Sequence, residues 1–196
     1  FNHTDTDSNS FTLGIDGDKN GALSTNNEKG PYLLIKDYNL GTNDFTISTW
    51  VKIEKNASIS GGNGTCIFAN SKIDKTTGTY LTLRKNNSGY LAQVSYSGDE
   101  GAYGDKTKSI SFVQGEWQLF TMTRSGNTLS LYFNGALVYT STLAEGTSLG
   151  ATDLCFGAYI NETWSYQDSA IAYDNIGIYD YALTDVEIAA LTASKK

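Results

Sequence analysis

The sequence contains very few of the side chains on which most soluble enzymes depend. Its 196 residues include one histidine (His3), two cysteines, one methionine and one proline. A single histidine near the first residue argues against Ser-His-Asp and Cys-His nucleophile systems and against HExxH-type zinc sites, since these need a histidine in the core of the fold or a pair of them. Most familiar enzyme chemistries are therefore disfavoured.

Basic residues and long apolar runs are scarce as well. The chain has 14 Lys+Arg against 21 Asp+Glu, which gives a formal net charge of −7 and a sequence pI near 4.6. Nucleic acids and anionic membrane surfaces attract proteins with a basic face, so neither is expected as a partner. No apolar run reaches the roughly 18 residues that a membrane-spanning helix requires, so we expect no membrane insertion.

The abundant residues are those of strands and tight turns. The sequence has 23 Thr, 19 Ser, 16 Asn, 20 Gly and 13 Tyr. Threonine and tyrosine favour strands, whereas asparagine, glycine and serine favour the turns between them. This composition is typical of a secreted or cell-surface β protein. Because the sequence starts at Phe1 with no signal-like segment, we interpret it as a mature domain taken from a larger multidomain protein.

Alternating apolar and polar residues recur along the chain. Clear examples are FTISTWVKI (45–53), YLAQVSYS (90–97), WQLFTMTR (117–124) and TLSLYFNG (128–135). The segments are joined by short turn signals such as KNNSG, SGN and NGA, which suit antiparallel hairpins. About ten strands at this spacing predict an all-β antiparallel fold, either a β-sandwich or a jelly roll. No linker or repeat divides the chain, so a single domain over 1–196 is expected.

One helix is predicted, near the end of the sequence. Thr184 can cap it, and Glu187 lies three residues further on, as a capping box requires. An apolar stripe at helical spacing follows and could pack on the sandwich; its members are Val186, Ile188, Ala189 and Leu191.

Three segments carry a family resemblance. The segment AIAYDNIGIYDYALTDVEIAAL (170–191) resembles the closing strand and helix of laminin-G-like, concanavalin A-like jelly-roll domains of the bacterial type. FTISTWVKI (45–53) is similar to an early central strand of that family, and GEWQLFTMTRSGNTLSLYFNGALV (115–138) to its Trp-led strand and the hairpin that follows. The resemblance implies about a dozen strands in two sheets. It leaves lectins, carbohydrate-binding modules, adhesion modules and some glycosidases as functions of the fold.

Catalysis is not supported by the carboxylates. Glucanases with a related sandwich carry a Glu-x-Asp-x-x-Glu strand that places two carboxylates on one face for retaining hydrolysis. That spacing is absent here, and the adjacent Asp99 and Glu100 would point to opposite faces of a strand. A non-catalytic module is expected, with a glycoside hydrolase as the weaker alternative.

A structural calcium ion is a second hypothesis. The segment Asp16-Gly-Asp18-Lys-Asn-Gly begins like a calcium loop, but its twelfth position is Asn27, so an EF-hand is excluded. By strand alternation Asp174 shares a face with Ile176 and Ile178, so it is expected to point inward. The resemblance implies a Ca²⁺ ion that ties the N-terminal loop to this strand through Asp174 with Asp18 or Asp16. The alternative is that backbone amides satisfy Asp174.

The candidate ligand residues are aromatic side chains in polar loops. Trp164 and Tyr166 lie in INETWSYQDS (160–169), where Asn161 and Asp168 could hydrogen-bond the hydroxyls of a sugar stacked on the rings. The alternative for Trp164 is a lid folded over the core. Further candidates are Tyr103 in the loop 97–107 and the outward face of the hairpin 79–96, with Tyr80, Arg84 and Gln93.

These residues predict a carbohydrate-binding, lectin-like module of an extracellular bacterial enzyme or surface protein. The net charge of −7 disfavours an acidic polymer, so a neutral glycan is the favoured partner. A protein-binding adhesion module and a structural spacer of the same fold are the alternatives. Cys66 and Cys155 either form a disulfide or remain two buried thiols, and both interpretations stay open.

Overall fold

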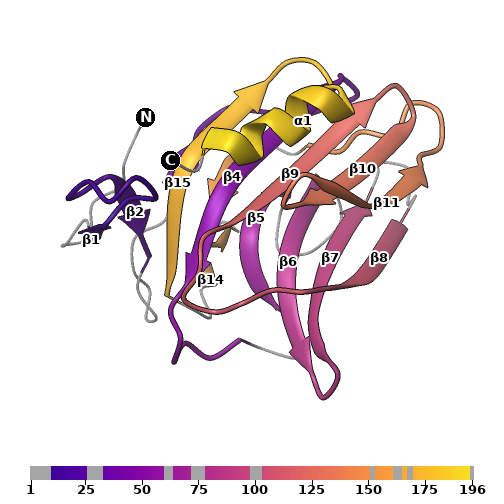
Figure 1. Ribbon diagram of the computed structural model, residues 1–196. Helices are drawn as coiled ribbons and strands as arrows, with labels where there is room; N and C mark the ends of the chain where they lie inside the picture. Colours follow the sequence, from indigo (N-terminus) through magenta and orange to yellow (C-terminus); the bar gives the residue numbers. More distant parts are fainter. Residues whose placement is uncertain are drawn as a thin grey trace.

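The protein folds as two antiparallel β-sheets packed face to face (Figure 1). The computed structural model describes residues 10–25, 33–59, 64–71, 78–97, 103–150, 153–160, 165–166 and 170–194. The first sheet has seven strands in the order β1 (Ser10–Thr12), β2 (Ala22–Ser24), β15 (Ile171–Tyr179), β4 (Phe45–Ile53), β9 (Gln118–Ser125), β10 (Thr128–Phe133) and β11 (Ala136–Thr142).

The second sheet has six strands. Their order is β3 (Leu33–Ile35), β12 (Leu154–Phe156), β5 (Thr65–Ser71), β6 (Gly78–Asn86), β7 (Gly89–Ser97) and β8 (Tyr103–Ile110). A short separate ladder pairs β13 (Tyr159–Ile160) with β14 (Ser165–Tyr166). The two large sheets confirm the predicted jelly-roll sandwich.

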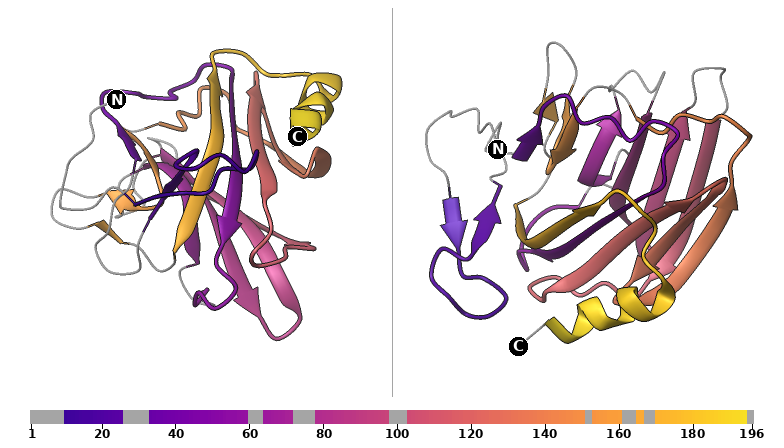
Figure 2. Two further views of the ribbon diagram at one scale, coloured as in Figure 1. Left: turned by 60° about the vertical axis from the view of Figure 1, so that its left-hand side comes forward. Right: turned by 90° about the horizontal axis from the view of Figure 1, so that it is seen from above.

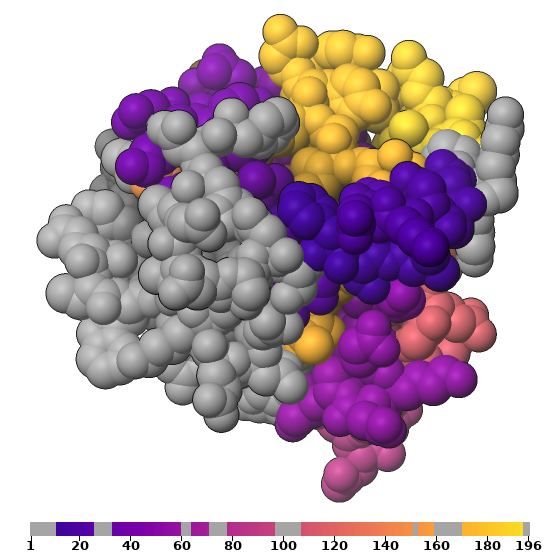
Figure 3. Space-filling model, turned by 90° about the vertical axis from the view of Figure 1, so that its left-hand side faces the viewer, coloured from indigo at the N-terminus to yellow at the C-terminus, as the bar shows by residue number. Residues whose placement is uncertain are grey.

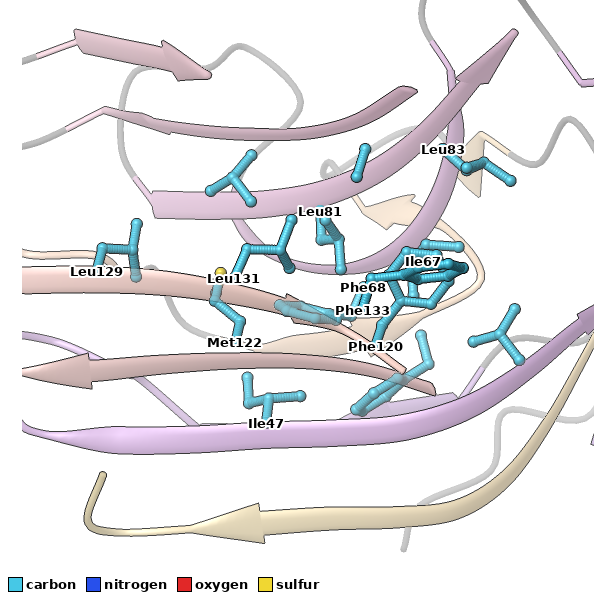
Figure 4. Packing of buried hydrophobic residues seen from close by; sticks show 14 of the residues in the cluster. Ile47, Ile67, Phe68, Leu81, Leu83, Phe120, Met122, Leu129, Leu131 and Phe133 are labelled. Atoms are coloured by element: carbon cyan, nitrogen blue, oxygen red, sulfur yellow. The ribbon is translucent and has the colours of Figure 1, made fainter. Parts of the chain in front are cut away.

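The hydrophobic core lies between the two sheets (Figure 4). The alternating pattern of each strand sends every second apolar side chain into this layer, as predicted. Burying one such side chain contributes roughly 1.5–3 kcal/mol. The labelled residues of Figure 4 are all buried and come from both sheets: Ile47, Phe120, Met122, Leu129, Leu131 and Phe133 from the first, and Ile67, Phe68, Leu81 and Leu83 from the second.

The turn chemistry follows the sequence closely. Asn134 and Gly135 connect β10 to β11 with φ values of 50° and 77°. Two successive positive φ angles define a type I′ turn, whose twist matches that of the flanking strands. The Asn-Gly pair therefore makes the predicted hairpin turn between β10 and β11.

The predicted helix is present as α1 (Asp185–Leu191), followed by the 3₁₀ turn η1 (Thr192–Ser194). It lies on the outer side of the seven-stranded sheet, as Figure 2 shows from above. Thr184 and Glu187 form the predicted capping box, with the Thr184 N–H donating to Glu187 Oε2 at 2.8 Å. No helix in the described part of the chain is long and apolar enough to cross a bilayer.

Only part of the predicted apolar stripe of this helix is buried. Ile188 is fully buried against Tyr132 and Leu183, and Leu191 packs beside them. Val186 is 79% exposed and Ala189 also faces solvent, so the prediction is wrong for these two residues. The reason is geometric: each residue turns by about 100° around a helix, so Val186 lies about 200° and Ala189 about 100° away from the buried Ile188.

Arg124 is the largest charged side chain in the described interior. It lies on β9 and is only 2% exposed. Its Nε donates to the carbonyl of Gly126 at 2.8 Å, and its Nη1 donates to the carbonyls of Gly41 and Thr147 at 3.1 and 2.7 Å. One guanidinium group therefore fastens three loops at the same end of the sandwich.

Candidate functional site

A β-bulge decides the direction in which Asp174 points. The pairing of β15 with β4 shifts register between Asp174 and Gly177, and Asn175 adopts a φ of 47°. Tyr173 is 1% exposed in the core, so its neighbour Asp174 lies on the outer face, opposite Trp50. The prediction that Asp174 points inward is wrong, because the extra residue of the bulge reverses the alternation before Ile178.

The outward carboxylate of Asp174 holds the N-terminal loop. Its Oδ2 accepts a hydrogen bond from the Ile15 amide at 2.8 Å, and its Oδ1 accepts one from the Asn175 amide at 2.7 Å. In Figure 3 the indigo N-terminal segment lies directly against the orange and yellow residues of the last strand. Backbone amides therefore satisfy Asp174 in part, which was the alternative to a metal ligand.

Two carboxylates nevertheless converge beside this loop. A Cβ atom placed on Gly14 would lie 2.8 Å from Asp18 Oδ1 and 3.0 Å from Asp174 Oδ2. Gly21 also leaves space for a carboxylate, since a Cβ atom placed on it would lie 2.6 Å from the Asp18 carboxylate. Oxygen donors of this kind fit a hard cation such as Ca²⁺.

The donor set at this loop is small. Asp16 is exposed on the turn, and in the described ranges no three His, Cys, Asp or Glu residues gather at one point. Asp18 and Asp174 would hold a Ca²⁺ ion, and backbone carbonyls and water would have to complete its coordination. Bound there, the ion would neutralise two carboxylates that face each other.

The predicted ligand face of the hairpin is much less open than expected. Tyr80 and Gln93 are each 6% exposed on the outer side of the six-stranded sheet. Tyr80 packs against Cys66 and Ala69, while Arg84 Nη1 donates to Gln93 Oε1 at 2.8 Å. The structure brings Arg84 and Gln93 together as a polar pair and gives Tyr80 a packing role.

The aromatic loop residues lie largely outside the described chain. Trp164, Asn161 and Asp168 fall in undescribed segments. Tyr166 belongs to β14 and Tyr103 to β8, but their side chains are likewise outside the described part. A ligand role for these five residues therefore stays a prediction.

The two cysteines are free and buried. Cys155 pairs across the sheet with Ala69, whereas Cys66 lies further along β5, beyond a bulge, with its thiol 3.5 Å from the Ala158 carbonyl. This diagonal placement does not match the close Cβ–Cβ approach of a disulfide. Burial raises the pKa of both thiols, so both stay protonated and inert at neutral pH.

An open groove runs between the two sheets at one end of the sandwich, and the sequence did not predict it. Its volume is about 860 Å³, within the range usual for ligand sites. One wall follows β3 and the other is the end of β15, two segments that lie close together at the top of Figure 3. The groove is lined by Ile35, Lys36, Asp37, Tyr38, Ile178, Tyr179, Asp180 and Tyr181.

Tyrosine and aspartate residues line this groove, which we call the tyrosine groove, although the Tyr179 side chain itself packs against Leu183 and Ile188 on the outer face of the seven-stranded sheet. Tyr181 is 49% exposed and packs edge-on against Tyr179, with ring centroids 5.9 Å apart. Gly177 makes room for the Tyr179 ring, because a Cβ there would lie 2.9 Å from it. Tyr181 is therefore an exposed ring held on a fixed support.

The electrostatic character of the tyrosine groove is acidic. Partial burial raises the pKa of the Tyr38 hydroxyl, and the negative charge of Asp180 raises it further. Asp37 has a φ of 56°, and its amide donates to Asp153 Oδ1 at 2.8 Å. The two walls come from distant parts of the sequence, and only the pairs Asp37-Tyr38 and Asp180-Tyr181 could have drawn attention to them.

Comparison with known proteins identifies the family. A model of the concanavalin A-like lectin/glucanases superfamily, of the laminin G type, matches residues 26–189. The chain therefore belongs to this superfamily, and the predicted resemblance is confirmed. A comparison with curated proteins finds no match.

Several solved structures with the same fold are binding domains of toxins. The binding domain of Paraclostridial Mosquitocidal Protein 1 aligns with a TM-score of 0.72 and 20% identity, over 93% of this chain and 45% of that one. The receptor binding domain of botulinum neurotoxin D aligns with a TM-score of 0.67 and 16% identity, over 89% and 44%.

A third such structure is the binding domain of botulinum neurotoxin DC in complex with rat synaptotagmin II. Its TM-score is 0.65 at 19% identity, over 89% of this chain and 42% of that one. The present chain thus spans less than half the length of these structures. At such identities the likeness defines the fold alone.

Proposed function

We propose that this protein is a non-catalytic, lectin-like carbohydrate-binding module of an extracellular protein. The observation that carries the proposal is the tyrosine groove, whose lining combines the exposed Tyr181 with two exposed acidic residues, Asp37 and Asp180. Sugar rings stack on aromatic faces through their C–H groups, and carboxylates accept hydrogen bonds from their hydroxyls. Membership of a superfamily that includes lectins agrees with this role.

The exposure of the groove carboxylates favours binding over hydrolysis. Asp37 and Asp180 are both open to water. A glycosidase needs one carboxyl group in an environment that keeps it protonated as the general acid, together with a second at a defined separation. Two fully hydrated carboxylates are suited to accept hydrogen bonds from a ligand, not to act as acid and nucleophile.

A protein ligand is the second candidate function. The structural neighbours are toxin binding domains, and one of them was solved in complex with rat synaptotagmin II. A protein-binding module would present a contiguous apolar patch of a few hundred Å². The tyrosine groove has a mixed aromatic and charged lining instead, which suits a glycan better.

Calcium belongs to the proposal as a structural ion. Asp18 and Asp174 would hold Ca²⁺ between the N-terminal loop and β15, near the end of the strand opposite to the tyrosine groove. The ion would fix the loop by neutralising the two carboxylates. Ligand binding in the groove should then depend on calcium only through the stability of the fold.

The test is a glycan-array screen of the chain with calcium and with chelator, followed by titration of the best glycan. We expect Tyr181→Ala to weaken binding at least tenfold, and Leu137→Ala, a similarly exposed apolar residue on β11, to leave it unchanged. Trp164→Ala tests the predicted loop site in the same way. A blank array in both conditions would refute glycan binding and favour the protein ligand.

A further inference from the structure

The tyrosine groove has more negative than positive charge around it. Asp37 and Asp180 lie on its two walls. Behind the wall that holds Asp37, the Asp153 carboxylate accepts a hydrogen bond from the Asp37 amide. Among the described residues that line the groove, Lys36 is the one basic side chain. Three carboxylates against one ammonium group favour a ligand that brings positive charge.

The field of these carboxylates reaches into the groove itself. Asp180 lies on one wall and Tyr38 on the other; burial, and after it the charge of Asp180, raises the pKa of the Tyr38 hydroxyl. The aromatic lining acts in the same direction, because the face of a tyrosine ring attracts a cation that approaches within about 6 Å. Among the three tyrosines that line the groove, Tyr181 is the exposed one, and its ring packs against Tyr179.

We infer that the tyrosine groove selects glycans that carry a protonated amino group, such as polymers of glucosamine, over neutral or acetylated ones. The inference rests on the proposed function and specifies its ligand. The ammonium group would lie between Asp180 and the Tyr181 ring, while the apolar face of the sugar stacks on the aromatic lining. Neutral analogues keep the stacking and lose the charge interaction.

The test compares a glucosamine tetramer with its fully N-acetylated counterpart by calorimetric titration of the whole chain. At about pH 5 the amines are protonated, because the oxygens beside a sugar amine lower its pKa below that of lysine but not below this pH. We expect the glucosamine tetramer to bind about tenfold more tightly, and the difference to shrink when salt is raised from about 0.05 to 0.5 M, because salt screens exposed charges.

Two substitutions with opposite expected effects on affinity separate the charge effect from loss of structure. Asp180→Asn should weaken binding of the glucosamine tetramer about two- to fivefold, whereas Lys36→Gln should strengthen it by a similar factor. Neither change should affect the acetylated tetramer. Glu116→Gln is the matched control, because Glu116 is exposed at the opposite end of the seven-stranded sheet.

The outcomes distinguish this inference from the function on which it rests. If the acetylated tetramer or another neutral glycan binds equally well in the groove, the inference is overturned while glycan binding stands. If tetra-lysine binds as tightly as the glucosamine tetramer and Asp180→Asn weakens both, the groove recognises cations regardless of the sugar, and the inference fails. If no glycan binds at all, both proposals fall.

Discussion

Removal of the Arg124 guanidinium group should destabilise the sandwich strongly, because this group is buried and holds several loops at once. The substitution Arg124→Met keeps a long, flexible side chain in the same space and removes all of its donors. Three loop carbonyls, those of Gly41, Gly126 and Thr147, then lose their partner at one end of the fold. The three loops that the guanidinium group holds together would then become free to separate.

The expected magnitude follows from these three bonds. A hydrogen bond with a charged partner contributes about 1.5–3 kcal/mol, but the methionine variant no longer has to bury a charge, which offsets part of the loss. We expect the free energy of unfolding to fall by about 3–5 kcal/mol. For a chain of this size that lowers Tm by roughly 6–20 °C. Arg124→Lys, which keeps the charge but not the geometry, should lose about half as much.

The assay is urea unfolding followed by tryptophan fluorescence, with Lys108→Met as the control because Lys108 is an exposed cation on β8. The midpoint should move while the slope with denaturant stays constant, since the surface exposed on unfolding hardly changes. A loss below about 1 kcal/mol in Arg124→Met would refute the reasoning, because it would mean that water replaces the guanidinium at no cost.

Three further predictions concern the metal, the thiols and the helix cap. Calcium should raise Tm relative to chelator, and Asp174→Asn should abolish that difference; equal melting curves for the unmodified chain would rule out the calcium site. A thiol reagent at neutral pH should label neither Cys66 nor Cys155 in the folded chain. In the unfolded chain, without reductant, it should label both, and labelling of neither thiol there would indicate a disulfide instead. Hydrogen bonds from the Thr184 amide and, second, from the Thr184 hydroxyl lower the pKa of Glu187 below its ordinary 4.5. The stabilisation by the ionised Glu187 is therefore complete above the pKa of the unfolded state and is lost as pH falls through the pKa of the folded state. Glu187→Gln should therefore flatten the pH dependence of Tm in that acidic window, and an unchanged profile would show that the capping box contributes nothing.

The fold was predictable because its signals are local. The alternation of FTISTWVKI and TLSLYF sets the faces of β4 and β10. The Asn134-Gly135 pair sets the turn from β10 to β11, and Thr184 with Glu187 sets the start of α1. Each of these features acts over a few residues, so composition and spacing are sufficient to identify it.

The candidate sites were predictable only in part. The link between the N-terminal loop and Asp174 was expected, but the inward direction of that side chain was wrong, because the register shift before Gly177 cannot be read from an alternating pattern. Tyr80 and Gln93 were placed on the correct face of their hairpin, yet they are buried. Alternation predicts the face of a strand and not what covers it.

The sequence by itself determined the class of this protein: two antiparallel sheets, one capped helix and little of the chemistry that catalysis needs. Only the tertiary structure reveals the tyrosine groove. It forms because the ends of β3 and β15, which belong to different sheets, lie side by side at one end of the sandwich. Neither Asp37-Tyr38 nor Asp180-Tyr181 forms a site alone, since a concave surface requires both walls.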